Sequence, residues 1–287
     1  MSRGLVAEPI TLPLNGRLSV RLYPDSRPSN LEISGLHKGL VLVADGEELV
    51  EEGAGFGVPV ARYRDKTYFP GSSRIEVLSS DTPVVRKTYH LDMVSRKSLG
   101  GRRISDSLYR PLHAAFHAAY VSIPRFRPIL NGVMRLREDA GLETSFERRK
   151  SRGEVPVTYT ISPTEIAVAV DLASLETDGL VEVAVLNEQG ARFCSYSDSN
   201  GLTLQGNQIG GWDVVAASEC RLCDPTKDVL FALRSVEGTC LRRGREAVRR
   251  RFSWAGLNYT LPPPLKMFRY RVILRESQRF EGDQKPL

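Results

Sequence analysis

Short stretches in which apolar and polar residues alternate run along most of this chain, and they limit its fold more than any other feature. Leu18–Tyr23, 155–161 and 165–171 all alternate in this way. A period of two points successive side chains to opposite faces, which is typical of a half-buried β-strand. Gly, Pro, Asn and Asp separate the stretches, as they do in the turns of β proteins. The pattern predicts a mainly β protein folded as a large antiparallel β-sandwich, for which a supersandwich is one form.

Two reversals within this pattern are specific enough to place hairpins. Asp45-Gly46 joins 40–44 to 47–50, and Asp-Gly supplies the positive φ angles that a two-residue turn requires. Ser162-Pro163-Thr164 joins 155–161 to 165–171. Further strands are expected at 58–64, 74–78, 84–93, 133–138, 143–149, 181–186, 229–234 and 268–275.

One segment departs from the alternation. Apolar side chains recur at helical spacing at Leu108, Leu112 and Phe116, among several alanines. We therefore expect one helix near residues 105–121, crossing the sandwich. A second helical candidate is the arginine-rich segment 243–251.

The length and composition fit one large β domain. All-β domains often reach the 287 residues of this chain, so we expect a single domain over 1–287. A subdivision near 148–154 is the alternative, because that basic, Gly-containing run fits a linker as well as a hairpin tip. No run of about eighteen apolar residues exists to span a bilayer, and the first residues do not read as a signal peptide. We expect a soluble, cytoplasmic protein with no membrane partner.

The net charge of +6 comes from arginine, since only eight of the 40 basic residues are lysines. Arginine pairs with carboxylates and phosphates through two hydrogen bonds, so a small anionic ligand fits this composition. A GC-rich genome or a hot habitat produces the same excess. Arg242–Arg251 holds six arginines, and Phe252 and Trp254 beside it can stack on bases. No recognisable nucleic-acid module accompanies the run, and charge runs are usually solvated faces.

All four cysteines lie in the second half of the chain, at Cys194, Cys220, Cys223 and Cys240. The Cys220-x-x-Cys223 spacing suits two thiolates on one zinc ion, with Cys194 and Cys240 as the remaining candidate ligands. A second Cys-x-x-Cys pair is missing. Disulfides and ordinary buried thiols remain open alternatives, and no metal site is predicted.

Two histidine patterns are candidates for chemistry. Alternation places His90 and Asp92 on one face of a strand, where the carboxylate can orient the imidazole as half of an acid–base pair. The alternative is an ordinary surface pair on an antiparallel sheet. His113 and His117 share a helical face, but the Glu of a zinc protease motif is replaced by Ala114. The neighbouring alanines favour packing there.

Aromatic and glycine-rich segments suggest a ligand site. Trp212 with Asp213 combines a flat ring and a carboxylate, as sugar sites often do, although a core tryptophan is the simpler interpretation. The glycine-rich stretch 53–57 continues into a strand, so it is no phosphate loop. Its glycines are expected to allow a tight turn or the close approach of another strand. Tyr68 follows and is a candidate for lining a groove beside this turn.

The stretch Val155–Asp171, two strands joined by a short turn, resembles a segment of galactose-mutarotase-like proteins. The strand density and a closing strand such as 268–275 agree with that comparison. The resemblance implies a large antiparallel supersandwich, from which the alanine-rich segment 108–121 departs.

The sugar epimerases of that family use a histidine acid and a late-chain glutamate base, as the resemblance implies. Neither motif matches here. His37 and His90 are the histidines that can serve, and Glu237 and Glu246 are late carboxylates without a place. No catalytic residue is carried over.

The leading hypothesis is a β-sandwich protein that binds, or acts on, a carbohydrate or sugar phosphate, with no cofactor. The alternative is a non-catalytic protein that binds nucleic acid or a protein partner through its arginine-rich segment. The first hypothesis expects His90, Asp92 and Trp212 to converge in one cleft. The second expects the arginines to form one flat stripe.

Overall fold

The described residues form two antiparallel β-sheets, one small and one large. The computed structural model describes residues 8–24, 38–50, 53–79, 83–99, 102–103, 142–249, 252–263 and 265–276, and the single residues 115, 125 and 129. Every pair of neighbouring strands within these ranges is antiparallel, as the alternating sequence predicts.

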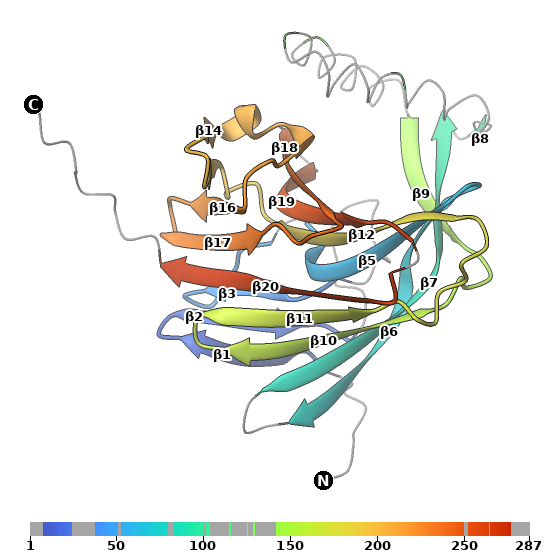
Figure 1. Ribbon diagram of the computed structural model, residues 1–287, viewed down its shortest axis with the longest axis horizontal. Coiled ribbons are helices and arrows are strands. Elements are labelled where there is room, and N and C mark those ends of the chain that lie inside the picture. Colours follow the sequence, from blue (N-terminus) through green and yellow to red (C-terminus); the bar gives the residue numbers. More distant parts are fainter. Residues whose placement is uncertain are drawn as a thin grey trace, which may run out of the picture.

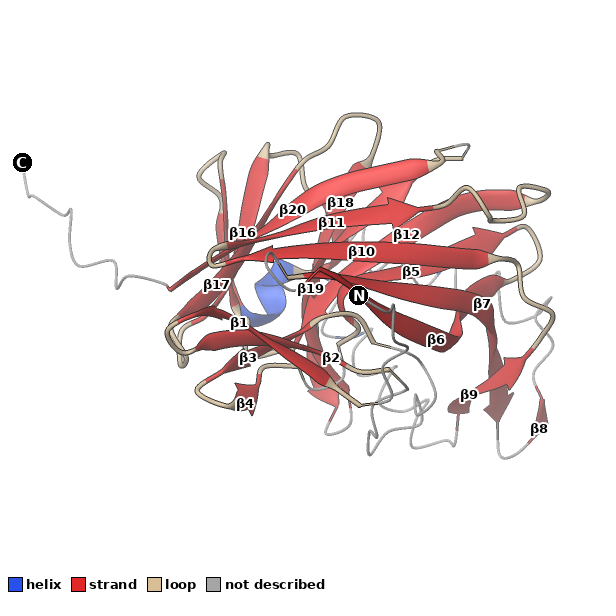
Figure 2. Cartoon of the chain, turned by 90° about the horizontal axis from the view of Figure 1, so that it is seen from below, coloured by secondary structure: helices blue, strands red, loops and turns tan. Residues whose placement is uncertain are grey.

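The small sheet is a meander near the N-terminus. Its strands, in spatial order, are β1 (Ile10–Asn15), β2 (Leu18–Leu22), β3 (Val41–Ala44) and β4 (Glu47–Glu48). The turn between β3 and β4 holds Asp45 and Gly46 at φ values of 51° and 79°, which confirms the predicted hairpin. Figure 2 shows this sheet beneath the strands of the large one.

The large sheet has sixteen strands among the described residues. Its strands are β5 (Gly55–Tyr63), β6 (Thr67–Ser79), β7 (Val84–Leu99), β8 (Arg102–Arg103), β9 (Leu142–Arg148), β10 (Glu154–Ser162), β11 (Glu165–Asp171), β12 (Leu180–Gln189), β13 (Ser195–Asp198), β14 (Thr203–Gln205), β15 (Gly211–Val214), β16 (Glu219–Asp224), β17 (Val229–Arg234), β18 (Cys240–Arg249), β19 (Phe252–Leu261) and β20 (Met267–Glu276). A 3-10 helix, η2 (Gly206–Ile209), precedes β15. The spatial order is β14-β13-β16-β17-β20-β11-β10-β7-β6-β5-β12-β19-β18-β15, and β8 and β9 also pair with β7.

The large sheet folds back on itself, so that two of its parts face each other as a sandwich (Figure 1). Phe56 of β5 meets Phe231 of β17 with ring centroids 5.2 Å apart. Tyr259 of β19 lies 5.0 Å from Tyr270 of β20, again between ring centroids. Contacts of this kind fill one continuous core between the layers. The predicted β-sandwich is confirmed.

Alternation of side chains produces these two layers. In β10, Val155, Val157 and Tyr159 are buried, whereas the residues between them are half-exposed. β11 continues the pattern and pairs with β10 through a turn at Pro163 and Thr164, closed by the pair Ser162 and Glu165, so the second predicted hairpin is also confirmed. Burial of the inward row supplies about 25 cal/mol per Å² of apolar surface.

The long strand β7 organises one side of the sandwich. β9 pairs antiparallel with residues 93–99 of β7, and β10 pairs antiparallel with residues 84–90. Between them, the N–H of Arg149 bonds to the carbonyl of Asp92, and the N–H of Arg152 bonds to the carbonyl of Leu91. Residues 148–154 therefore run alongside β7 between β9 and β10, and they do not form the tip of a hairpin.

The prediction of a helix at 243–251 is wrong. Residues 243–249 belong to β18, which pairs with β15 on one side and β19 on the other. The backbone groups of this segment are satisfied by two neighbouring strands, and that tertiary pairing overrides the helical character of its arginines. The helix expected at 105–121 lies outside the described residues except for Ala115, and so does the strand expected at 133–138. Strand β9 confirms the one expected at 143–149.

Within the described ranges, no helix is long and apolar enough to cross a membrane.

Candidate functional site

The two candidates on β7 each have a different partner. His90 faces Glu154, with Nδ1 and Oε1 3.6 Å apart, and Arg74 bonds to the same carboxylate at 2.9 Å. Asp92 pairs instead with Arg148, at 3.4 Å. The Arg74 hydrogen bond lowers the pKa of Glu154. His90 thus belongs to a half-exposed ion-pair cluster on the sheet surface.

The aromatic candidates lie on different parts of the fold. Trp212 and Asp213 are on β15, which five strands separate from β7 in the large sheet. Asp213 pairs with Arg243 at 3.6 Å. Tyr68 is buried in the core, where its ring meets Tyr63 edge-on. The structure therefore does not bring the predicted catalytic residues together with Trp212.

Cys220 and Cys223 are not positioned to bind one metal ion together. Residues three apart on a strand face opposite ways, and in β16 Cys220 is buried while Cys223 is half-exposed. All four cysteines are described, and none of them takes part in a disulfide. Burial raises the pKa of the Cys220 thiol to about 12, so it stays protonated. Within the part of the chain that the structure describes, no three His, Cys, Asp or Glu side chains gather as metal ligands.

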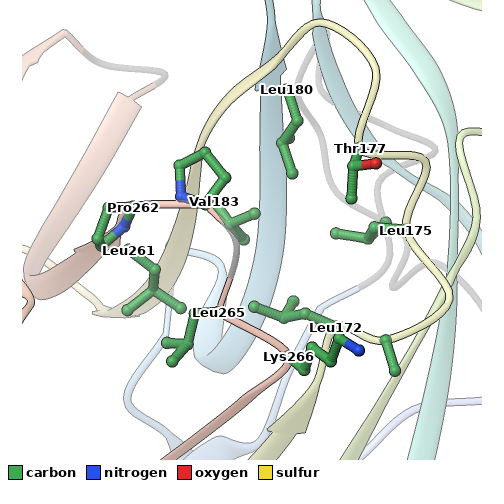
Figure 3. Close-up of a pocket in the computed structure, with 11 residues that line it drawn as sticks. Leu172, Leu175, Thr177, Leu180, Val183, Leu261, Pro262, Leu265 and Lys266 are labelled. Atoms are coloured by element: carbon green, nitrogen blue, oxygen red, sulfur yellow. The ribbon is translucent and has the colours of Figure 1, made fainter.

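One cavity opens near the start of β12, with a volume of about 70 Å³. Figure 3 shows leucine and valine side chains converging on it from the 172–183 segment and from 261–265. Its lining is almost entirely apolar, with Thr177 and Lys266 as its polar members. A space of this size and chemistry has room for a few atoms and holds no acid–base pair.

A different part of β12, residues 186–188, is irregular on both sides. Towards β5 the pairing shifts between Leu186 and Asn187, so that Gly57 is an extra, bulged residue at φ 82°. Towards β19 the ladder skips Leu186 and Asn187 and resumes at Glu188 with the same register. Bulges of this kind are common beside functional sites, because they redirect side chains.

Polar side chains replace the missing ladder bonds at this break. Asn187 N donates to Asn258 Oδ1 at 2.7 Å, and Asn258 Nδ2 donates to Glu188 Oε1 at 3.0 Å. The N–H of Ala54 donates to the other oxygen of Glu188 at 3.1 Å. Both oxygens of Glu188 therefore have a donor, although the side chain comes from the middle of a sheet.

The carboxyl group of Glu188 has a raised pKa. Desolvation raises its pKa, while the hydrogen bonds from Asn258 and Ala54 and the charge of Lys38 lower it in part. Because the folded-state pKa exceeds the unfolded one, its protonated form stabilises the fold at low pH, and this contribution is lost as pH rises through the raised pKa. A carboxyl group in this state can accept or donate a proton closer to neutral pH.

Trp212 lies on the same face of the sheet as Glu188. Glu188 pairs with Gly256, which pairs with Gly244. A Cβ on Gly256 would lie 2.7 Å from Glu188 Cγ, and one on Gly244 would lie 3.1 Å from the Trp212 ring. Glycines thus let the carboxyl group and the indole lie close above adjacent strands. Trp254, next along β19 on this face, stacks against Trp212 with centroids 4.5 Å apart.

This arrangement can be tested by circular dichroism. The chain has two tryptophans, and their stacked rings lie only 4.5 Å apart between centroids, close enough for strong excitonic coupling, so we expect an exciton couplet from the pair. Gly244→Ala should weaken the couplet strongly, because the new methyl group must displace Trp212. Gly238→Ala is the control, since a Cβ there meets nothing within 4 Å. An unchanged couplet in Gly244→Ala would show that Trp212 does not rest on this glycine.

Sequence reasoning did not single out Glu188, Asn187, Asn258 or Lys38. The available signal was the polar triplet Asn187-Glu188-Gln189 at the end of an alternating strand. The glycines 53–57 were expected to allow close approach, and this is confirmed: Cβ atoms on Gly53 and Gly55 would lie 2.7 Å and 2.8 Å from backbone oxygens of neighbouring segments.

No protein-family model matches the chain, and no curated protein matches it. Among solved structures, it is similar to a galactose mutarotase-like protein from Lactobacillus casei ATCC 334. The sequence identity is 12% and the TM-score 0.41, over 95% of this chain and 99% of that chain. The neighbour belongs to the group of proteins that the stretch 155–171 resembles. At this level of similarity the neighbour decides no activity for this chain.

Proposed function

We propose that this chain binds a carbohydrate or sugar phosphate on the face of β12, β19 and β18 turned away from the core, and that Glu188 exchanges a proton with the bound sugar. The observation that carries the proposal is the double interruption of β12. It places a carboxyl group of raised pKa beside the amide of Asn258, on the face of the sheet that also carries Trp212 and Trp254.

Each component suits a sugar. A half-buried indole such as Trp212 offers a flat apolar surface for the C–H face of a pyranose ring. Glu188 supplies an acceptor for hydroxyl groups, and Asn258 holds that carboxyl group in place. Arg242, in register with Asn258 on β18, adds a positive charge on the same face that suits an anionic substituent.

The arginine-rich segment supports the rival hypothesis less well. Arg242 bonds to the carbonyl of Trp212, and Arg245 bonds to the carbonyl of Ala191. Arg243 pairs with Asp213 and lies over the ring of Tyr196. Alternation along β18 turns Arg242 and Arg243 to opposite faces, so these arginines make no flat stripe along a phosphate backbone.

A panel of neutral sugars and sugar phosphates, screened for thermal stabilisation, tests the proposal. A ligand at one hundred times its Kd should stabilise the fold by about 2.7 kcal/mol. Glu188→Gln and Trp212→Ala should abolish the shift. Glu237→Gln, in an exposed turn, should retain it. The proposal fails if no sugar raises the melting temperature, or if both variants respond as the unaltered protein does.

A further inference from the structure

We propose that Asn258 is a positioning residue for Glu188, and that Asn187 and Tyr270 fix its orientation from within the core. The inference rests on the proposed function in so far as Glu188 meets the ligand. It adds a chain of hydrogen bonds that connects the sandwich interior to the outer face and governs the protonation of Glu188.

The orientation of the Asn258 amide is determined by its neighbours. An asparagine side chain has an acceptor end and a donor end, and exchanging them reverses what it offers. Asn187 contributes a backbone N–H, which can only donate, and it faces Asn258 Oδ1 at 2.7 Å. The amide nitrogen must then point to Glu188, where the distance to Oε1 is 3.0 Å. Asn258 therefore always presents a donor to this carboxyl group.

The next link, Asn187, is held from inside the sandwich. Its side chain is fully buried, and its Oδ1 accepts from the Tyr270 hydroxyl at 2.6 Å and from the N–H of Gly57 at 3.2 Å. Its Nδ2 donates to the carbonyl of Val185 at 3.3 Å. These bonds satisfy the bulged backbone of Gly57, and they hold β12 in the geometry that aims the Asn187 N–H at Asn258.

Desolvation raises the pKa of Glu188, whereas its hydrogen bonds and the charge of Lys38 lower it. A hydrogen bond donated to a carboxylate favours the charged form, so Asn258 opposes the desolvation that raises the pKa. Lys38 acts in the same direction, and its Nζ is held by the carbonyl of Gly53 at 2.6 Å. Among the described side chains of β18, the charged groups on this face are Arg242 and Glu246, in register with Asn258 and Trp254. Asn258 thus keeps Glu188 available as an oriented base at lower pH than burial alone would allow.

The test is a titration of the Glu188 carboxyl carbon by NMR in the full chain, with the signal assigned by its loss in Glu188→Gln. Asn258→Ala should raise the pKa of Glu188 by about one unit, because one charge-assisted hydrogen bond is lost. Asn258→Asp should raise it further. It keeps the acceptor for Asn187 but replaces the donor with a second negative charge.

Two adjacent core tyrosines provide a matched pair that probes the chain at a distance. Tyr270→Phe removes the 2.6 Å bond to Asn187 and should raise the pKa of Glu188 by a smaller amount. Tyr259→Phe removes a bond of the same length, to the carbonyl of Arg234, and should leave Glu188 unchanged. The two rings lie only 5.0 Å apart between centroids, so general loosening of the core would affect both variants alike.

These outcomes separate the positioning role from the proposed function. An unchanged Glu188 pKa in Asn258→Ala, or equal shifts in the two tyrosine variants, would overturn the positioning role whether or not a sugar binds. If a sugar binds through the carboxylate, its affinity should rise with pH through the Glu188 pKa. Asn258→Ala should then move that rise to higher pH by the same interval that NMR measures.

Discussion

Replacing Lys87 with methionine is expected to lower the free energy of unfolding by about 2–4 kcal/mol. Lys87 is fully buried, and its Nζ donates to the carbonyls of Tyr23 and Lys38, both at 2.7 Å. Methionine fills a similar volume but leaves both acceptors without their charged donor. The ammonium group also lies over the Tyr89 ring at 5.2 Å, a contact that methionine does not reproduce.

Urea denaturation measures this loss, and Lys150→Met is its control. Lys150 is exposed, so the same change there should alter stability by less than about 0.5 kcal/mol. Lys87 joins three segments, because Tyr23 follows β2, Lys38 precedes β3 and Lys87 itself lies on β7. Equal free energies of unfolding for the two variants would contradict this stabilising role of Lys87, because the carbonyls of Tyr23 and Lys38 would then have found other donors.

Gly57→Ala is the second substitution with a large expected effect, about 2–4 kcal/mol. One part of this cost is the positive φ of 82°, which disfavours any residue with a Cβ. The other part is steric, since the new Cβ would lie 2.8 Å from the Tyr159 hydroxyl. Gly179→Ala isolates the first part: its φ is 72° and a Cβ there meets nothing within 4 Å. It should lose only about 1–2 kcal/mol.

A double variant distinguishes the steric contribution. Tyr159→Phe alone loses the hydroxyl bond to the carbonyl of Phe56, which measures 2.9 Å. In Gly57→Ala with Tyr159→Phe, the atom nearest the new methyl group is gone, so the combined loss should be smaller than the sum of the two single losses. Strict additivity in the denaturation midpoints would contradict a direct clash between these residues.

Local patterns predicted the strands because each carries its own signature. Val155 to Asp171 shows two alternating runs and a turn, and β10 and β11 follow them closely. The order of the strands has no such signature. β5 pairs with β12, more than a hundred residues along the chain, because their buried rows fit the same core. The segment 243–249 taken alone is compatible with a helix, and only its pairing with β15 and β19 makes it a strand.

The candidate site was harder to predict for the same reason. A glutamate in an alternating strand reads as an ordinary solvent-facing residue, and Glu188 has that position in β12. Its character depends on a bulge at Gly57 and on the amide of Asn258, seventy residues away. His90 and Asp92 have the right spacing for a pair, but neighbouring strands supply Glu154 and Arg148 first. Tertiary neighbours decide which local possibility is realised.

The position of β20 has a consequence for the order of assembly during synthesis. β20 lies inside the large sheet, between β11 and β17, although it comes last among the described strands. Until Met267–Glu276 has left the ribosome, β11 and β17 each present an unpaired edge to other nascent chains. Closure of the sheet is then a late, long-range event, which slows folding. Ribosome-bound chains ending before residue 267 should therefore depend most on chaperones.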